Sequence, residues 1–124
     1  MDLYGEIILD HYKNPQHKGR MEKPATSAED VNPLCGDKIR MDFQISNDGV
    51  IEDVVFSGEG CAISQASASM LTDKLMGKKI QEISALDNDF IFQMLQVQLT
   101  PARIKCALLA LAVAKKAAIL YKLK

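Results

Sequence analysis

Residues 39–56 contain the pattern that most restricts how this chain folds. Between residues 39 and 45, apolar side chains alternate with polar ones, as they do in a strand that buries one face. The apolar positions are Ile39, Met41, Phe43 and Ile45. Asn47-Asp48-Gly49 then supplies residues that tolerate a positive φ, and a second apolar segment follows at 50–56. The pattern predicts an antiparallel β-hairpin.

The segment before the hairpin gives one clear signal and one weak one. Residues 2–12 carry apolar side chains at helical spacing, with Asp2 as a candidate N-cap and Asn14-Pro15 as the stop. Residues 16–31 are mostly polar and are interrupted by glycine and proline. We therefore expect a short amphipathic helix, followed by a loop or an irregular edge strand.

Only helical patterns follow the hairpin. A helix rich in small residues is expected to start after Gly60 and to end at Gly77, and 80–98 contains one or two short helical pieces. The last helix has Thr100 as its N-cap and Pro101 at its first position, and it continues to the end of the sequence. This order predicts an α+β fold with a small antiparallel sheet of two to three strands and helices packed mainly on one face.

The composition is that of an ordinary soluble globular protein, with 48% hydrophobic and 25% charged residues. Its 124 residues fit a single domain spanning 1–124. The formal net charge is −1, so neither a nucleic acid nor a membrane is expected as a partner. The sequence has no export-signal pattern and no apolar run of the roughly 18 residues that span a bilayer, so we expect a cytoplasmic protein.

The three cysteines are isolated in the sequence, and each lies where a metal ligand is plausible. In a reducing compartment an odd number of cysteines favours metal or thiol chemistry, or buried inert thiols, over a disulfide framework. Cys35 precedes Gly36 and Asp37 at the entrance to the hairpin, so Cys35 and Asp37 can face one ion. Cys61 opens a helix directly after the second strand. The helix N-terminus favours its thiolate, and the hairpin returns it to the same end of the sheet as Cys35 and Asp37.

Cys106 lies in the second turn of the last helix, so only tertiary packing can bring it to the other three candidates. The nearby Arg103 and Lys105 favour its thiolate, although a surface lysine on a helix needs no function. Thiolates suit zinc or iron, and the aspartate adds a harder oxygen ligand. For each motif alone a core thiol is the preferred interpretation, so the prediction rests on their convergence. The predicted ligands are Cys35, Asp37, Cys61 and Cys106, with Lys105 and Arg103 beside them.

The cysteine segments resemble, in order, the three motifs of the IscU/SufU/NifU N-terminal family of iron–sulfur cluster assembly proteins. They are Asn32-Pro33-Leu34-Cys35-Gly36-Asp37, Gly58-Glu59-Gly60-Cys61-Ala62-Ile63-Ser64-Gln65-Ala66-Ser67-Ala68-Ser69 and Ile104-Lys105-Cys106-Ala107-Leu108-Leu109. The opening Leu3-Tyr4 and Asp10-His11-Tyr12-Lys13-Asn14-Pro15 is similar as well, so nearly the whole chain is covered.

This resemblance implies a scaffold that is not an enzyme. A cluster, of the 2Fe–2S type, is assembled on such a scaffold from iron and from sulfur supplied by a cysteine desulfurase, and it passes to apo acceptor proteins. The four predicted ligands would hold the cluster, with Lys105 and Arg103 handling an incoming persulfide. The resemblance also implies that zinc occupies the cluster-free form.

The chain combines features of two branches of this family. Lys105 stands where IscU-type scaffolds usually carry histidine, and 102–106 is similar to the SufU branch, whose members bind zinc and accept sulfur. The stretch between Cys61 and Cys106, however, has the shorter IscU-like length. Residues 99–103 depart from the segment that IscU offers to its heat-shock chaperone, so they do not support that chaperone as a partner.

Two functions of different classes therefore compete. The leading one is a cluster scaffold, and the alternative is a zinc-dependent sulfurtransferase in which one cysteine leaves the metal to accept and pass on sulfane sulfur. A thiol hydrolase is disfavoured because neither His11 nor His17 is placed by the sequence as a base for a cysteine, and His11 is expected to pack or dock. A purely structural zinc module is disfavoured because three thiolates and a carboxylate form an unusual set for such a site.

Overall fold

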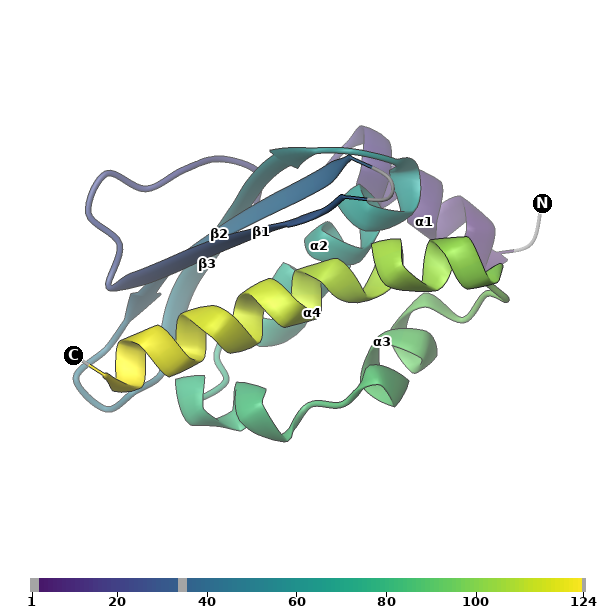
Figure 1. Ribbon diagram of the computed structural model, residues 1–124. Helices are drawn as coiled ribbons and strands as arrows, with labels where there is room; N and C mark the ends of the chain where they lie inside the picture. Colours follow the sequence, from purple (N-terminus) through teal and green to yellow (C-terminus); the bar gives the residue numbers. More distant parts are fainter. Residues whose placement is uncertain (1–2, 34–35, 124) are drawn as a thin grey trace.

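The computed structural model describes residues 3–33 and 36–123. Its elements are α1 (Leu3–Lys13), β1 (Thr26–Asn32), β2 (Asp37–Ile45), β3 (Ile51–Glu59), α2 (Ala62–Leu75), the 3₁₀-helix η1 (Ile80–Ala85), α3 (Asn88–Leu95) and α4 (Pro101–Lys122). Within the described residues, the strands form one antiparallel sheet in the order β1-β2-β3, and the helices gather on one side of it (Figure 1). The expected α+β class is confirmed.

β2 and β3 form the predicted hairpin. Their register pairs Met41 with Phe56 and Phe43 with Val54, and all four side chains are at most 1% exposed. These residues face the helices, so the alternating pattern buries one face of the sheet as expected. Gly49 in the connecting turn has a φ of +83°, the positive value that the Asn-Asp-Gly sequence favours.

β1 lies in the segment expected to be a loop or an irregular edge strand, and it is a regular outer strand. It pairs with β2 along its whole length. Its buried residues are Thr26, Ala28 and Asn32, of which two are polar. This strand therefore lacks the alternation of apolar and polar residues that marks a half-buried strand in a sequence. The Thr26 hydroxyl instead donates a hydrogen bond of 2.9 Å to the Ala117 carbonyl oxygen of α4.

The outer edge of β3 is covered in two places. The Phe56 N–H donates to the His17 carbonyl oxygen at 2.9 Å, and the Gly19 N–H donates to the Phe56 carbonyl oxygen at 2.8 Å. At the other end, the Ile51 N–H donates to the Lys78 carbonyl oxygen at 2.8 Å. These contacts satisfy backbone groups that an open edge strand would expose, and they hold His17 beside the helical layer.

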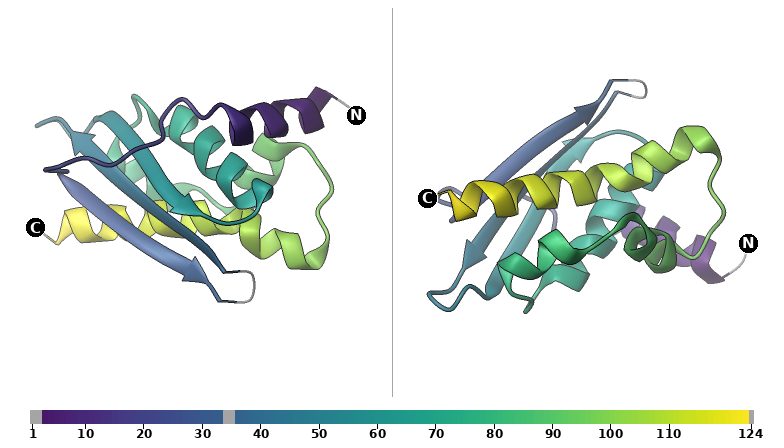
Figure 2. Two further views of the ribbon diagram at one scale, coloured as in Figure 1. Left: turned by 90° about the horizontal axis from the view of Figure 1, so that it is seen from above. Right: turned by 60° about the horizontal axis from the view of Figure 1, so that its bottom comes forward.

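α2 is a helix of small residues that packs in the centre of the molecule. It begins after its N-cap Cys61 and ends at Leu75, and Gly77 follows with a φ of +84°. All residues from 64 to 69 are buried. The Ser67 hydroxyl donates a hydrogen bond of 2.7 Å to the Ala107 carbonyl oxygen of α4. Small side chains thus let α2 approach both the sheet and α4, while α1 lies along its other side (Figure 2).

α4 is the longest described helix, with 22 residues. It begins at Pro101 after the N-cap Thr100, as predicted, although the Thr100 side chain makes no capping hydrogen bond within the described part of the chain. It lies beside β1 and against α2, while η1 and α3 contact it from the side away from the sheet (Figures 1 and 2). No described helix combines the length and the apolarity needed to cross a membrane.

Candidate metal centre

Three of the predicted ligands meet at one end of the sheet. Asp37 is the first residue of β2, Cys61 is the N-cap of α2, and Cys106 lies in the second turn of α4. Their potential ligand atoms, one carboxylate oxygen and two sulfurs, lie within 4.8 Å of one another. Cys35 lies outside the described residues. The structure thus brings together three segments that are far apart in the sequence.

The Asp37 carboxylate is fully buried, although a carboxylate at the start of a strand usually faces solvent. Its Oδ1 accepts a hydrogen bond of 2.8 Å from the Cys61 N–H, at the positive end of α2. Its Oδ2 is buried and has no hydrogen-bond partner among the described residues. A buried oxygen without a partner is destabilising, and a cation would satisfy it. This carboxylate therefore fits a metal-binding role.

Glycine is required where the β3–α2 connection passes the carboxylate. Gly60 has a φ of +145°, and a Cβ at this position would overlap Asp37 Oδ1 and lie 2.9 Å from the Ser64 hydroxyl oxygen. A Cβ at Gly58 would overlap the Lys38 carbonyl oxygen on β2. The two glycines that precede Cys61 thus let the backbone approach β2 closely enough to place Cys61 beside Asp37.

Cys106 is fully buried, whereas Cys61 is partly exposed. The Cys106 sulfur lies 3.8 Å from the Ala102 carbonyl oxygen, to which its thiol donates. It also accepts a hydrogen bond of 3.9 Å from Nδ2 of Asn32, the last residue of β1. Asn32 was not among the predicted site residues. The signal for it in the sequence is a polar residue that opens the first cysteine segment.

Arg103 and Lys105 differ in their relation to the sulfurs. The pKa of Arg103 is raised, mainly by a hydrogen bond to Cys106. The charge of Cys61 and a hydrogen bond to Cys61 raise it further. The exposed guanidinium therefore places a positive charge close to both sulfurs. Lys105 is exposed and lines a neighbouring groove with Val31 and Leu108. Of the two predicted neighbours, Arg103 is the one with contacts to the described sulfurs.

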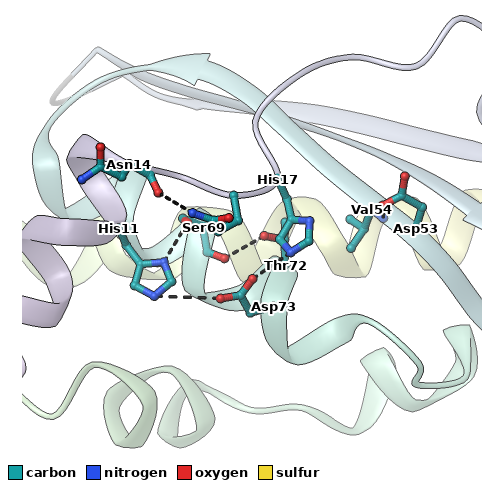
Figure 3. Close-up of polar contacts among 9 residues, drawn as sticks. His11, Asn14, His17, Asp53, Val54, Ser69, Thr72 and Asp73 are labelled. Atoms are coloured by element: carbon teal, nitrogen blue, oxygen red, sulfur yellow. Dashed lines mark hydrogen bonds and ion pairs between the residues drawn. The ribbon is translucent and has the colours of Figure 1, made fainter.

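Both histidines lie outside this group. His11 Nδ1 is 2.8 Å from the Ser69 hydroxyl oxygen, and His17 Nε2 is 2.8 Å from Asp73 Oδ1 (Figure 3). Ser69 and Asp73 belong to α2, so these contacts attach the N-terminal segment to that helix. In the described residues, the potential ligand group consists of Asp37, Cys61 and Cys106 alone. The location of His11 agrees with the packing role expected for it.

The donor set suits a particular kind of ion. Two sulfurs are soft ligands for zinc or iron, and one carboxylate oxygen is a harder ligand that zinc also accepts. The partial exposure of Cys61 leaves the group accessible from solvent. The described residues thus fit a zinc or iron site that needs one further ligand, and Cys35 remains the predicted fourth.

Comparison with known proteins agrees with this arrangement. Residues 3–124 match the family model of the NifU-like N terminal domain. The chain is 40% identical over 125 residues to the zinc-dependent sulfurtransferase SufU of Bacillus subtilis (strain 168), covering 87% of this chain and 84% of the relative. It is 32% identical over 124 residues to the iron–sulfur cluster assembly scaffold protein IscU of Haemophilus influenzae, covering 98% and 97%.

A solved structure shows the same fold. The crystal structure of a putative iron–sulfur cluster assembly scaffold protein for the SUF system from Fervidobacterium islandicum AW-1 matches with a TM-score of 0.77. The two are 29% identical, and the match covers 91% of this chain and 94% of that one. The family model, the identity to these relatives and the shared fold show that the chain belongs to the family of NifU-like N-terminal domains.

Proposed function

We propose that this protein is a scaffold on which iron–sulfur clusters are assembled, acting as a single domain. It receives sulfur from a cysteine desulfurase and passes the finished cluster to apo acceptor proteins. The observation that carries the proposal is the buried Asp37 carboxylate, which lies in the same group as Cys61 and Cys106 and has one oxygen without a partner among the described residues. Membership of the family, and the scaffold named among its relatives, support the same conclusion.

The ligand set explains why such a site would release its cargo. Cys35, Cys61 and Cys106 supply thiolates, which bind iron strongly, while Asp37 supplies a harder oxygen ligand. One oxygen ligand in place of a thiolate makes the site more labile than four thiolates would. We assign the cargo to the 2Fe–2S type that the family resemblance implies, and four protein ligands are compatible with it. Zinc would be held by the same residues in the cluster-free form.

We attribute sulfur acceptance to the cysteines that lie close to Arg103. A thiolate attacks the outer sulfur of the desulfurase persulfide, the S–S bond of that persulfide breaks, and the desulfurase thiolate leaves. The Arg103 guanidinium supports this step because it is a cation close to Cys61 and Cys106 and can attract the negatively charged persulfide, with Lys105 as a second nearby cation. Mass spectrometry of single Cys→Ser variants after brief reaction with the desulfurase identifies the first acceptor.

The alternative function is a zinc-dependent sulfurtransferase that keeps its metal and carries only sulfur. The 40% identity to a protein of that name favours it. One experiment separates the two functions: the protein is incubated anaerobically with ferrous iron, cysteine and a cysteine desulfurase. A scaffold develops the visible absorption of a cluster on the chain. A persulfide with zinc retained, and no visible absorption, would overturn the scaffold proposal in favour of the sulfurtransferase.

A further inference from the structure

Asn32 is a buried residue at which the parts of the candidate metal centre meet. Its side chain is 6% exposed. Its backbone is paired with Asp37 across β1 and β2. Its carbonyl oxygen accepts a hydrogen bond of 2.8 Å from the Gly36 N–H, which closes the connection between the two strands. The backbone of Asn32 thus adjoins Asp37, one of the predicted ligands.

The side chain of Asn32 reaches a second predicted ligand, Cys106. Its Nδ2 lies 3.9 Å from the Cys106 sulfur and donates a hydrogen bond to it. An amide nitrogen carries two N–H donors and no charge, whereas a metal-bound thiolate can only accept. The amide orientation that places nitrogen against the sulfur is therefore the one that a ligating thiolate requires.

The hydrogen bond between the Cys106 thiol and the Ala102 carbonyl oxygen is lost when a metal binds the sulfur. The thiol donates to the Ala102 carbonyl oxygen, with 3.8 Å between sulfur and oxygen. A thiolate has lost that proton and cannot make this bond, but it is a better acceptor for the Asn32 N–H. Asn32 thus offers the contact that persists in the metal-loaded state.

We propose that Asn32 is a positioning residue that holds the Cys106 sulfur toward the metal centre through an N–H···S hydrogen bond. The inference rests on the proposed function of the site. Such a bond fixes the direction of the sulfur, as partners of metal ligands generally do. It also withdraws electron density from the sulfur, which makes a bound cluster easier to reduce. A neutral donor does this without adding a further positive charge to that of Arg103.

The first test compares two variants of β1, in each of which an apolar side chain of similar size replaces a buried hydrogen-bond donor. Asn32→Leu removes the donor to Cys106, while Thr26→Val removes the hydroxyl donor to Ala117 of α4. We expect Asn32→Leu to weaken zinc binding about 10-fold or more, the effect usual for the partner of a ligand. We expect Thr26→Val to bind zinc within about twofold of the unmodified protein, because neither partner is near the sulfurs. Equal zinc affinity in the two variants would overturn the proposal.

The second test needs no variant, so it does not depend on whether Asn32→Leu folds. In the unmodified protein loaded with ¹¹³Cd, a scalar coupling is expected between the metal and a side-chain amide proton of Asn32, transmitted through the hydrogen bond. Absence of that coupling, while the Cys106 protons show coupling to the metal, would contradict the proposal. Neither test uses iron or a desulfurase, so failure of cluster assembly leaves both results interpretable on their own.

Discussion

Two clusters of polar residues lie along α2, and the residue types in both are ones that commonly bind metals. At its N-terminus, Cys61 lies beside Asp37 and Cys106. Further along the helix, Asp73 faces His17 and His11 (Figure 3). In the histidine group His17 contacts Asp73 and His11 contacts Ser69, and the Asp73 side chain is 41% exposed. In the cysteine group, Asp37 is fully buried and one of its oxygens is unpartnered among the described residues.

The difference shows that residue type alone does not make a metal site. Histidine and aspartate that bond to each other and remain in contact with water form a complete structural contact, which here fixes α1 and the following segment on α2. A buried carboxylate oxygen that has no partner among the described residues is destabilising unless an ion binds it. Metal chemistry is therefore expected at the cysteine group and not at the histidine group, and variants of each group test this contrast.

The largest effect is expected from removing a direct ligand. Cys106→Ser should lower zinc affinity more than about 100-fold, because a ligand contributes more than the outer partners whose loss costs 10–100-fold. The double variant His11→Ala/His17→Ala is the control, and its zinc affinity should match that of the unmodified protein. Competition with a chromophoric chelator measures both. A large loss in the histidine variant would reverse the contrast between the two groups.

A smaller effect is expected from Gly60→Ala, which adds a methyl group where Asp37 Oδ1 lies. The carboxylate must move, so we expect zinc affinity to fall about 10-fold and the free energy of unfolding to fall by about 1–3 kcal/mol. The control is Gly77→Ala, at a position that also has a positive φ, +84°, but has no atom within 4 Å of the added Cβ. It should lose stability and keep its zinc affinity. If both variants bind zinc equally well, Asp37 is not a ligand.

Asp37→Cys tests the role of the carboxylate in release. Four thiolates should hold a cluster more firmly than three thiolates and one oxygen, so transfer to an apo acceptor should slow several-fold. The transfer is followed by the visible spectrum of the acceptor under anaerobic conditions. Unchanged transfer kinetics would show that the oxygen ligand is not what makes the site labile.

The smallest effect is expected in the histidine group. Asp73→Asn keeps the size of the side chain but removes the charge that faces both histidines. Because the pair is partly exposed, we expect the free energy of unfolding to fall by only about 0.5–1 kcal/mol, measured by denaturant titration. Zinc affinity should not change. A measurable loss of zinc would show that the two groups on α2 are coupled.

Much of the fold could be predicted because it depends on strong local patterns. The hairpin follows from alternation on either side of an Asn-Asp-Gly turn, and the start of α4 follows from Thr100 and Pro101. The approach of Asp37 to Cys61 could also be anticipated, since the end of β3 returns beside the start of β2. These predictions needed only the periodicity of a strand, the chemistry of turns and the preferences of helix ends.

Other features could not be predicted because they depend on packing. β1 buries two polar residues, Thr26 and Asn32, against α4, so its sequence shows no apolar alternation. The complete burial of Asp37 follows from the close passage of Gly60, which is visible only in three dimensions. The contact of Asn32 with Cys106 joins residues that are 74 positions apart.

X-ray absorption spectroscopy of the zinc-loaded protein tests the central claim most directly. We predict one zinc ion per chain, bound by three sulfurs at about 2.3 Å and one oxygen at about 2.0–2.2 Å. Coordination by imidazole nitrogen from His11 or His17, or fewer than three sulfurs, would contradict it.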